Sequence, residues 1–203
     1  MSTKFQYNKT SLQAIQKQLK ARVTALPTIK SKESALRLEV KKTKNELNDL
    51  LSAFENQIKQ YEYFAKLWNE FDETLIFVKD VEFDTKKHAG VMVPVFKNIV
   101  FEEKPYSYFN SPIWFFDGIK ILKELAQIGI IAEIAKIKLE RIEYARRKTT
   151  QKVNLFEKVQ IPGFQSAILK IKRYLEDEES LSKSSQKIMR ASIERKEKQE
   201  ESV

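Results

Sequence analysis

Apolar residues recur in alternating steps of three and four over residues 11–71. This is the spacing of a heptad seam, in which a helix presents one narrow apolar stripe to a second helix. A helix of about sixty residues extends roughly 90 Å at 1.5 Å per residue, so it needs a partner along its whole length. The seam consists of Leu12, Ile15, Leu19, Leu26, Ile29, Leu36, Val40, Leu47, Leu50 and Phe54.

Polar residues and a proline interrupt the seam. Arg22, Glu33 and Thr43 occupy seam positions, and Pro27 removes one backbone hydrogen-bond donor. We therefore expect a kink or a local break near residues 24–27. After residue 54 the register restarts, which predicts a stutter within the same helix. The restarted positions are Ile58, Tyr61, Ala65 and Trp68.

Residues 1–8 form a short lead-in that we expect to be disordered, and Asn8, Thr10 or Ser11 can cap the first helix.

The middle of the chain has a different period. Apolar and polar residues alternate from 75 to 83 and again from 91 to 101, on either side of a turn region at 86–90. This predicts a β-hairpin or a small sheet, in which Pro94 must lie at an edge or a bulge.

A hairpin alone is marginally stable in water, so we expect aromatic residues to cover it. The residues available for this are Tyr106, Tyr108, Phe109, Trp114, Phe115 and Phe116. The same aromatic head is equally suited to docking on a partner.

A second helical region follows, starting at Ser111–Pro112. Between Ile128 and Ile137 it is apolar on more than one face, which predicts contact with a second partner besides the coiled-coil mate. Pro162–Gly163 predicts a helix break near 154–163. The seam then resumes at Phe164, Ile168, Ile171, Leu175, Leu181 and Ile188.

These segments predict a mainly α fold. The long helix over 9–72 and the C-terminal helices over 112–200 pair as an antiparallel two-helix coiled coil. A small β-hairpin and aromatic head over 73–111 interrupts the chain in the middle. The two seams can pair within one chain only if they run antiparallel.

Composition limits the chemistry that this chain can perform. It has 203 residues, no cysteine and a net charge of +9. Residues 1–70 carry 13 basic against 7 acidic side chains and residues 119–203 carry 19 against 13, whereas residues 71–118 carry 5 against 8. We find no phosphate-binding glycine loop and no catalytic cluster, and we interpret His88 as a solvated turn residue. The pattern favours a non-catalytic protein without cofactor or metal, with no signal peptide and no apolar stretch long enough to insert into a membrane.

Three short motifs resemble one family. Residues 29–36 (IKSKESAL) resemble a Leu-Lys-Arg-Lys-Arg-Asp-Ala-Leu signature, with Ser31 and Glu33 in place of arginines. Lys152-Val153-Asn154 with Glu157 and Ile161-Pro162 resembles an Arg-Val-Asn-Ala-Leu-Glu…Ile-Pro stretch. Pro105-Tyr106-Ser107 and Ser111-Pro112 with Trp114 resemble a connection out of a head. In this order they are similar to the D subunit of V-type and archaeal A-type ATPases, in a divergent bacterial-type branch.

The resemblance implies a rotor axle in the centre of the complex. Such an axle would enter the hexamer of A and B subunits, bind the F subunit along its shaft, and meet a funnel-like subunit on the rotating membrane ring. It would couple ATP hydrolysis or synthesis to proton or sodium transport, as a cytoplasmic protein peripheral to the membrane. Expected hexamer contacts are Ile29, Lys30, Lys32, Arg37, Ile188 and Arg190. Expected contacts of the F subunit are Ile130, Ile131, Ile134, Ile137, Val153, Asn154 and Glu157.

Two other functions are compatible with parts of the pattern. The sequence pI of about 9.5 suggests nucleic-acid binding, but lysines interleave with acidic residues and form no unbroken basic stripe. A stand-alone coiled-coil or membrane-surface scaffold would leave the aromatic head without a purpose.

Overall fold

The computed structural model describes residues 5–105 and 111–200, except for the side chains of Phe64 and of residues 196–200. It divides into two compact units, one formed by the residues up to Lys30 together with those from Thr150, and the other by Ser31–Thr149. Tyr106, Tyr108 and Phe109, which we expected to cover the hairpin, lie outside the described residues.

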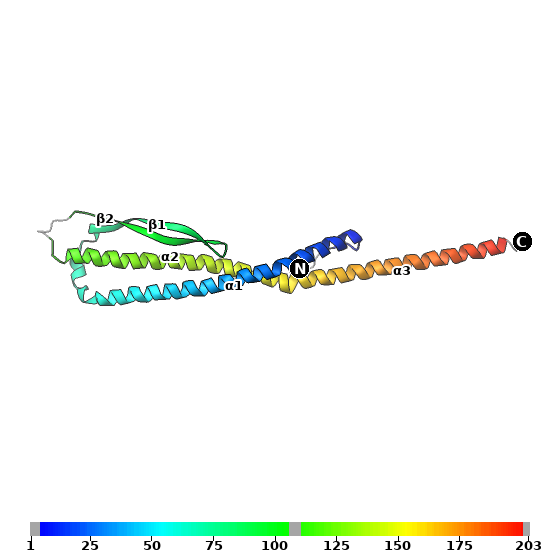
Figure 1. Ribbon diagram of the computed structural model, residues 1–203, viewed down its shortest axis with the longest axis horizontal. Coiled ribbons are helices and arrows are strands. Elements are labelled where there is room, and N and C mark those ends of the chain that lie inside the picture. The colour runs from blue at the N-terminus through cyan, green and yellow to red at the C-terminus, as the bar shows by residue number, and fades with distance from the viewer. Residues whose placement is uncertain (1–4, 106–110, 201–203) are drawn as a thin grey trace. The chain divides into compact units, whose positions relative to one another are not determined.

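Three long helices and one hairpin make up most of the described chain (Figure 1). The predicted mainly α fold, an antiparallel helical coiled coil with a central β-hairpin, is confirmed. The elements are α1 (Lys9–Gln60), β1 (Ile76–His88), β2 (Val91–Glu103), α2 (Phe115–Asn154) and α3 (Ile161–Glu200). Short 3-10 turns follow α1 at Glu62–Phe64, Leu67–Glu70 and Glu73–Leu75, and a π-helical turn, Leu155–Gln160, joins α2 to α3.

The α1 seam is continuous and includes its polar members. Arg22 and Glu33 are half-buried and Thr43 is fully buried, in the same three-four register as the apolar residues around them. Pro27 lies inside the uninterrupted helix, so the expected local break is wrong. Pro27 is exposed and costs one backbone hydrogen bond, whereas half-buried seam residues on either side keep the helix packed.

The expected stutter after Phe54 is also wrong, because α1 ends at Gln60. Ile58, which the stutter would place in the seam, remains 46% exposed. The chain beyond Gln60 folds into tight turns around aromatic residues, and Phe71 is buried with Trp68 and Trp114 packed against it. The helix therefore ends earlier than the apolar spacing predicts, and the aromatic residues after it form a separate cluster.

In the first unit, α1 and α3 pack antiparallel through an apolar core. Ile15 of α1 is buried against Phe164, Ala167 and Ile171 of α3. Polar contacts follow the same direction, because a later α1 residue, Arg22, reaches back to Gln160.

Residues 5–8 of the lead-in to α1 pack near this core, contrary to the disorder that we expected there, whereas residues 1–4 lie outside the described part of the chain. Phe5 packs against the core cluster, and the Tyr7 ring lies 4.9 Å from that of Tyr174. Asn8 caps α1, as one of the three candidates predicted, because its side-chain oxygen accepts the Ser11 N–H at 2.7 Å.

In the second unit, β1 and β2 form an antiparallel hairpin from Ile76↔Glu103 to His88↔Val91. The turn is only two residues long, and Ala89 and Gly90 have φ values of 48° and 82°. Positive φ at both positions is the type I′ geometry that fits the twist of a hairpin. Pro94 lies opposite Thr85 in this two-stranded sheet, where each strand is an edge and a missing donor is tolerated.

The hairpin lies alongside α2 (Figure 1). Near its turn, Val93 is fully buried with Leu36 of α1 and Ile142 of α2. At its other end, Ile76 packs against the cluster that contains Phe115 and Ile119. The hairpin thus packs on α2 near both of its ends, at Ile142 and at Phe115 and Ile119.

His88 has a defined contact, so its interpretation as a solvated turn residue is wrong. It ends β1, and its Nδ1 lies 3.3 Å from Oε1 of Glu39 on α1. Lys138 of α2 is 4.0 Å from the same carboxylate oxygen and 3.3 Å from Glu46. The sequence carries no signal for this contact, because it joins three elements that are far apart along the chain.

Thr43→Val is expected to stabilise the second unit. Thr43 is fully buried, and its hydroxyl oxygen has no hydrogen-bond partner among the described residues. Valine has the same shape without the hydroxyl, so the substitution removes the cost of an unpaired buried polar group, about 1–3 kcal/mol. Urea unfolding of the two proteins measures the difference, and a lower midpoint for the variant would contradict the expectation.

Candidate functional site

The structure joins two residues that the sequence assigns to different partners. Lys30, an expected hexamer contact, forms an ion pair with Glu157, an expected contact of the F subunit, at 2.8 Å. Both side chains remain 47% exposed. The pair therefore links α1 to the π-helical turn within the first unit while leaving both charges accessible to a partner.

Exchanging these two charges is expected to have little effect on stability. An exposed ion pair contributes about 0–1 kcal/mol, so Lys30→Glu or Glu157→Lys alone should cost less than roughly 1 kcal/mol. The double variant should regain most of that loss. A double-mutant cycle by chemical unfolding measures the coupling, and a coupling well above 1 kcal/mol would show a stronger contact than its exposure indicates.

Arg22 of α1 contacts both the π-helical turn and the start of α3. Its Nε donates to Oε1 of Gln160 at 2.6 Å, and its guanidinium lies 4.9 Å from the centre of the Phe164 ring. The guanidinium is also 5.9 Å from the Phe156 ring. A seam arginine is thus satisfied by a hydrogen bond and two aromatic rings, which the heptad pattern alone does not indicate.

The remaining residues expected to bind the F subunit all lie on α2 and are buried to different degrees. Ile130, Ile131 and Ile134 are half-buried, and Ile137 is 36% exposed. Val153 is half-buried and Asn154 is exposed at the end of α2. The structure assigns Ile130–Ile137 to the second unit and residues 153–157 to the first.

The other expected hexamer residues are likewise divided between the units. Lys32 and Arg37 belong to the second unit, where Arg37 pairs with Glu33 on its own helix at 2.9 Å. Lys32 lies close to the hairpin turn, since a Cβ added to Gly90 would be 3.2 Å from its Nζ. Ile188 and Arg190 lie on α3 in the first unit, both exposed.

The C-terminal half of α3 presents apolar side chains to solvent. Isolated helices gain little from propensity alone, and in proteins an apolar face normally packs on a partner. The exposed apolar residues here are Leu181 (70%), Ile188 (72%), Met189 (62%) and Ile193 (50%). This stretch is therefore a candidate contact surface for another molecule.

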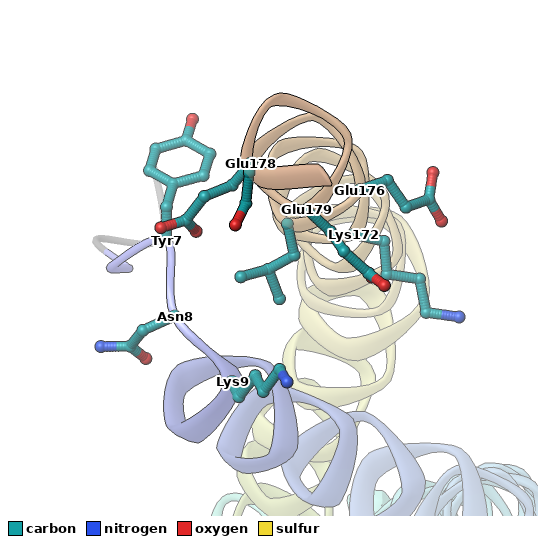
Figure 2. Close-up of a pocket in the computed structure, with 9 residues that line it drawn as sticks. Tyr7, Asn8, Lys9, Lys172, Glu176, Glu178 and Glu179 are labelled. Carbon is teal, nitrogen blue, oxygen red and sulfur yellow. The ribbon is translucent and has the colours of Figure 1, made fainter. Parts of the chain in front are cut away.

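An open groove of about 730 Å³ lies beside the start of α1 in the first unit (Figure 2). Tyr7, Asn8 and Lys9 line one side of it, and α3 lines the other. Here a hydrogen bond from Lys183 lowers the pKa of the Glu179 carboxyl below its ordinary value, and Lys9 contributes further. Sequence reasoning missed this groove, because it depends on how the lead-in packs against α3. The remaining lining residues are Lys172, Leu175, Glu176, Glu178 and Ser182.

Two apolar grooves of about 430 Å³ each meet at Trp68 and Leu122 in the second unit. One lies against the hairpin at Phe77 and Phe101, and the other extends to Tyr61. Burial raises the pKa of the Tyr61 hydroxyl above its ordinary value, and the Glu124 carboxylate 3.4 Å away raises it further. The lining of these grooves thus combines hairpin residues of the predicted head over 73–111 with residues of α1, α2 and the turns after α1.

The described residues show none of the features of a metal or membrane-spanning site. Within 5–105 and 111–200, no three His, Cys, Asp or Glu side chains are placed to hold a metal ion. The described helices contain no segment of the length and apolarity needed to cross a membrane.

Comparison with known proteins identifies the family. The family model for the D subunit of ATP synthase matches residues 11–191. The chain belongs to the family of ATP synthase D subunits. The V-type ATP synthase D subunit of Borreliella burgdorferi is 32% identical over 196 residues, covering 94% of this chain and 96% of the relative. That of Chlamydia muridarum is 31% identical over 182 residues, covering 87% and 90%.

The match to the family of D subunits includes nearly all of α1, the hairpin, α2 and most of α3. Both units therefore belong to the family region, and so do all the expected contact residues up to Arg190. The sequence-based identification of the family is confirmed.

Proposed function

We propose that this chain is the non-catalytic central rotor subunit of a V-type ATP synthase. It would couple ATP hydrolysis or synthesis in the A/B hexamer to proton or sodium transport by rotating as a unit with the membrane ring. The family match over residues 11–191 carries this proposal. The length and helical pairing of α1, α2 and α3 support it, because a shaft that transmits torque must be stiff.

The exposed apolar end of α3 is proposed to contact the bore of the hexamer. Leu181, Ile188 and Met189 are each more than 60% exposed, so a surrounding protein would bury substantial apolar area there. Rotation couples to catalysis only if the axle contacts the three catalytic interfaces differently at each angle, and linkage then makes nucleotide state and axle angle mutually dependent. Ile29, Lys30, Lys32, Arg37 and Arg190 are proposed as further contacts of the hexamer.

The F subunit is proposed to bind α2 and the turn that follows it. Ile137 is partly exposed among half-buried isoleucines, which leaves apolar surface that a partner could cover. Glu157 and Asn154 add exposed polar groups nearby in sequence.

The funnel-like subunit of the membrane ring is proposed to bind the aromatic head, where the grooves at Trp68 and Leu122 are apolar. These partners would place the chain in the cytoplasm, peripheral to the membrane.

Reconstitution tests the proposal directly. The chain is co-expressed with candidate A, B and F subunits, and the complexes are separated by size-exclusion chromatography and assayed for ATPase activity. The expected result is one copy of this chain per hexamer and an activity that depends on it. A chain that elutes alone and leaves the activity of the ring unchanged would reject the rotor function.

Matched variants separate the two contact surfaces. Ile188→Asp with Met189→Asp should weaken binding to the hexamer, whereas Ser184→Asp with Ser185→Asp adds the same charge at neighbouring exposed positions and should weaken it less. Ile130→Asp with Ile134→Asp should abolish capture of the F subunit in a pull-down. Unchanged capture by a variant whose circular dichroism is normal would reject that assignment.

A further inference from the structure

The junction between α2 and α3 is a helical turn that is wider than an α-helix. Its six residues, Leu155–Gln160, form a π-helix, and the N–H of Ile161 donates to the carbonyl of Phe156, five residues earlier. An α-helix spans four residues between donor and acceptor. A π-helical turn therefore holds an extra residue within an otherwise continuous helix, and such turns are frequent at functional sites.

Pro162 accounts for the position of this turn. It is the second residue of α3, it has no N–H to donate, and in an α-helix its ring would clash with the carbonyl four residues before it. That carbonyl belongs to Lys158, inside the wide turn. A wider turn leaves more room for that ring than an α-helix does, and the missing donor falls where the hydrogen-bond ladder is already irregular; Pro27 lies in α1 without such a turn.

Two α1 side chains tie down the turn. Arg22 holds Gln160 at its last residue through the 2.6 Å hydrogen bond and lies over the Phe156 ring. Lys30 holds Glu157 near its first residue at 2.8 Å. The turn itself contributes no buried residue, and Leu155 and Val159 are 44% and 46% exposed. Polar and cation–π contacts, rather than a packed core, hold this geometry.

We propose that residues 155–162 are a helix-phase switch with two states. In one state the extra residue stays in the π-helical turn, held by Pro162, Arg22 and Lys30. In the other state the turn becomes α-helical and the extra residue is taken up by α2. A shift of one residue rotates the direction in which the side chains of that part of α2 point by about 100° around the helix axis. Movement toward α3 is blocked by Pro162 and by the core that contains Phe164. Its use to absorb twist in a loaded shaft rests on the proposed rotor function.

Hydrogen–deuterium exchange of the isolated full-length chain tests the switch without any partner protein. Arg22→Met keeps an apolar stem but removes the hydrogen bond and the charge, so amides of 155–161 should exchange about tenfold faster. Pro162→Ala removes the clash and restores a donor, so the same amides should exchange more slowly. Opposite effects of the two variants on one segment distinguish a switch from general destabilisation.

Pro27→Ala is the matched control, because it also replaces a proline within a helix of the first unit. It should leave exchange at 155–161 unchanged. If amides of 155–161 exchange at the same rate or faster in Pro162→Ala, the proposal is overturned. It is also overturned if Arg22→Met speeds exchange throughout residues 164–175, because that would be general destabilisation.

A one-residue deletion provides a second measurement. Removing Val159 together with Pro162→Ala eliminates the extra residue, so the melting temperature should change by only a few degrees. Removing Ser166, an exposed residue within α3, shifts Ala167 and Ile171 out of the core and should lower the melting temperature far more. Equal decreases in melting temperature for the two deletions would reject the switch.

The rotor function is tested separately, because a switch confirmed in the isolated chain can coexist with failed reconstitution.

Discussion

Leu36→Ala is expected to lower the free energy of unfolding of the second unit by about 2–5 kcal/mol, the usual cost of truncating a fully buried leucine. The Leu36 side chain has no exposed surface, and it is packed between Val93 of the hairpin and Ile142 of α2. Its loss leaves a cavity where three elements meet. The expected consequence is a lower denaturant midpoint and weaker protection of the hairpin amides in hydrogen exchange.

Leu38→Ala is the control for this prediction, since Leu38 lies two residues away on α1 and is 70% exposed. Its cost should be within about 0.5 kcal/mol, as is usual for surface substitutions. Similar losses from both variants would show that the core at Leu36 is not what holds the hairpin.

Gly118→Ala is expected to destabilise the aromatic head by about 1–3 kcal/mol through overpacking. A Cβ at this position would lie 3.0 Å from Cζ3 of Trp114 and 3.2 Å from Cε2 of Phe71. Both rings are held by neighbouring rings. Trp114 packs edge-on against Trp68, and Phe71 packs against Phe115 with the two rings tilted. The gain in helix propensity from alanine, about 1 kcal/mol, offsets part of this cost.

Gly129→Ala gives the opposite expectation on the same helix. A Cβ there would lie 3.6 Å from Cε2 of Phe54, which is an ordinary van der Waals contact. The variant should therefore gain up to about 1 kcal/mol from helix propensity. Thermal unfolding followed by near-ultraviolet circular dichroism measures both variants, and a stabilised Gly118→Ala protein would show that the rings can move aside.

The apolar spacing predicted the pairing of the helices because a seam reports directly on burial. Arg22, Glu33 and Thr43 broke the pattern in the sequence, yet all three lie in the seam. Arg22 is accommodated by Gln160 and Phe164, which are far away along the chain. Periodicity indicates where a helix faces its partner, but it cannot show how a polar seam residue is satisfied.

Helix ends were predicted less well, because distant contacts decide them. The apolar spacing continues past Gln60, but the helix stops where Trp68, Phe71 and Trp114 gather. Pro162–Gly163 predicted a helix break near 154–163, but the chain stays helical through these residues, and a π-helical turn takes the place of the break. The contact between His88 and Glu39 left no pattern in either segment, so no local rule could have found it.

The boundary between the two units passes through two helices, α1 and α2, and not through loops. Starting a helix is unfavourable by a factor of roughly a thousand, whereas extending an existing one is close to neutral. Whichever unit folds first therefore presents the other with two helices that need only grow. The free-energy cost of starting each of these helices therefore arises only once for the two units. Folding of one unit lowers the kinetic barrier to folding of the other, even though the apolar clusters of the two units share no residues.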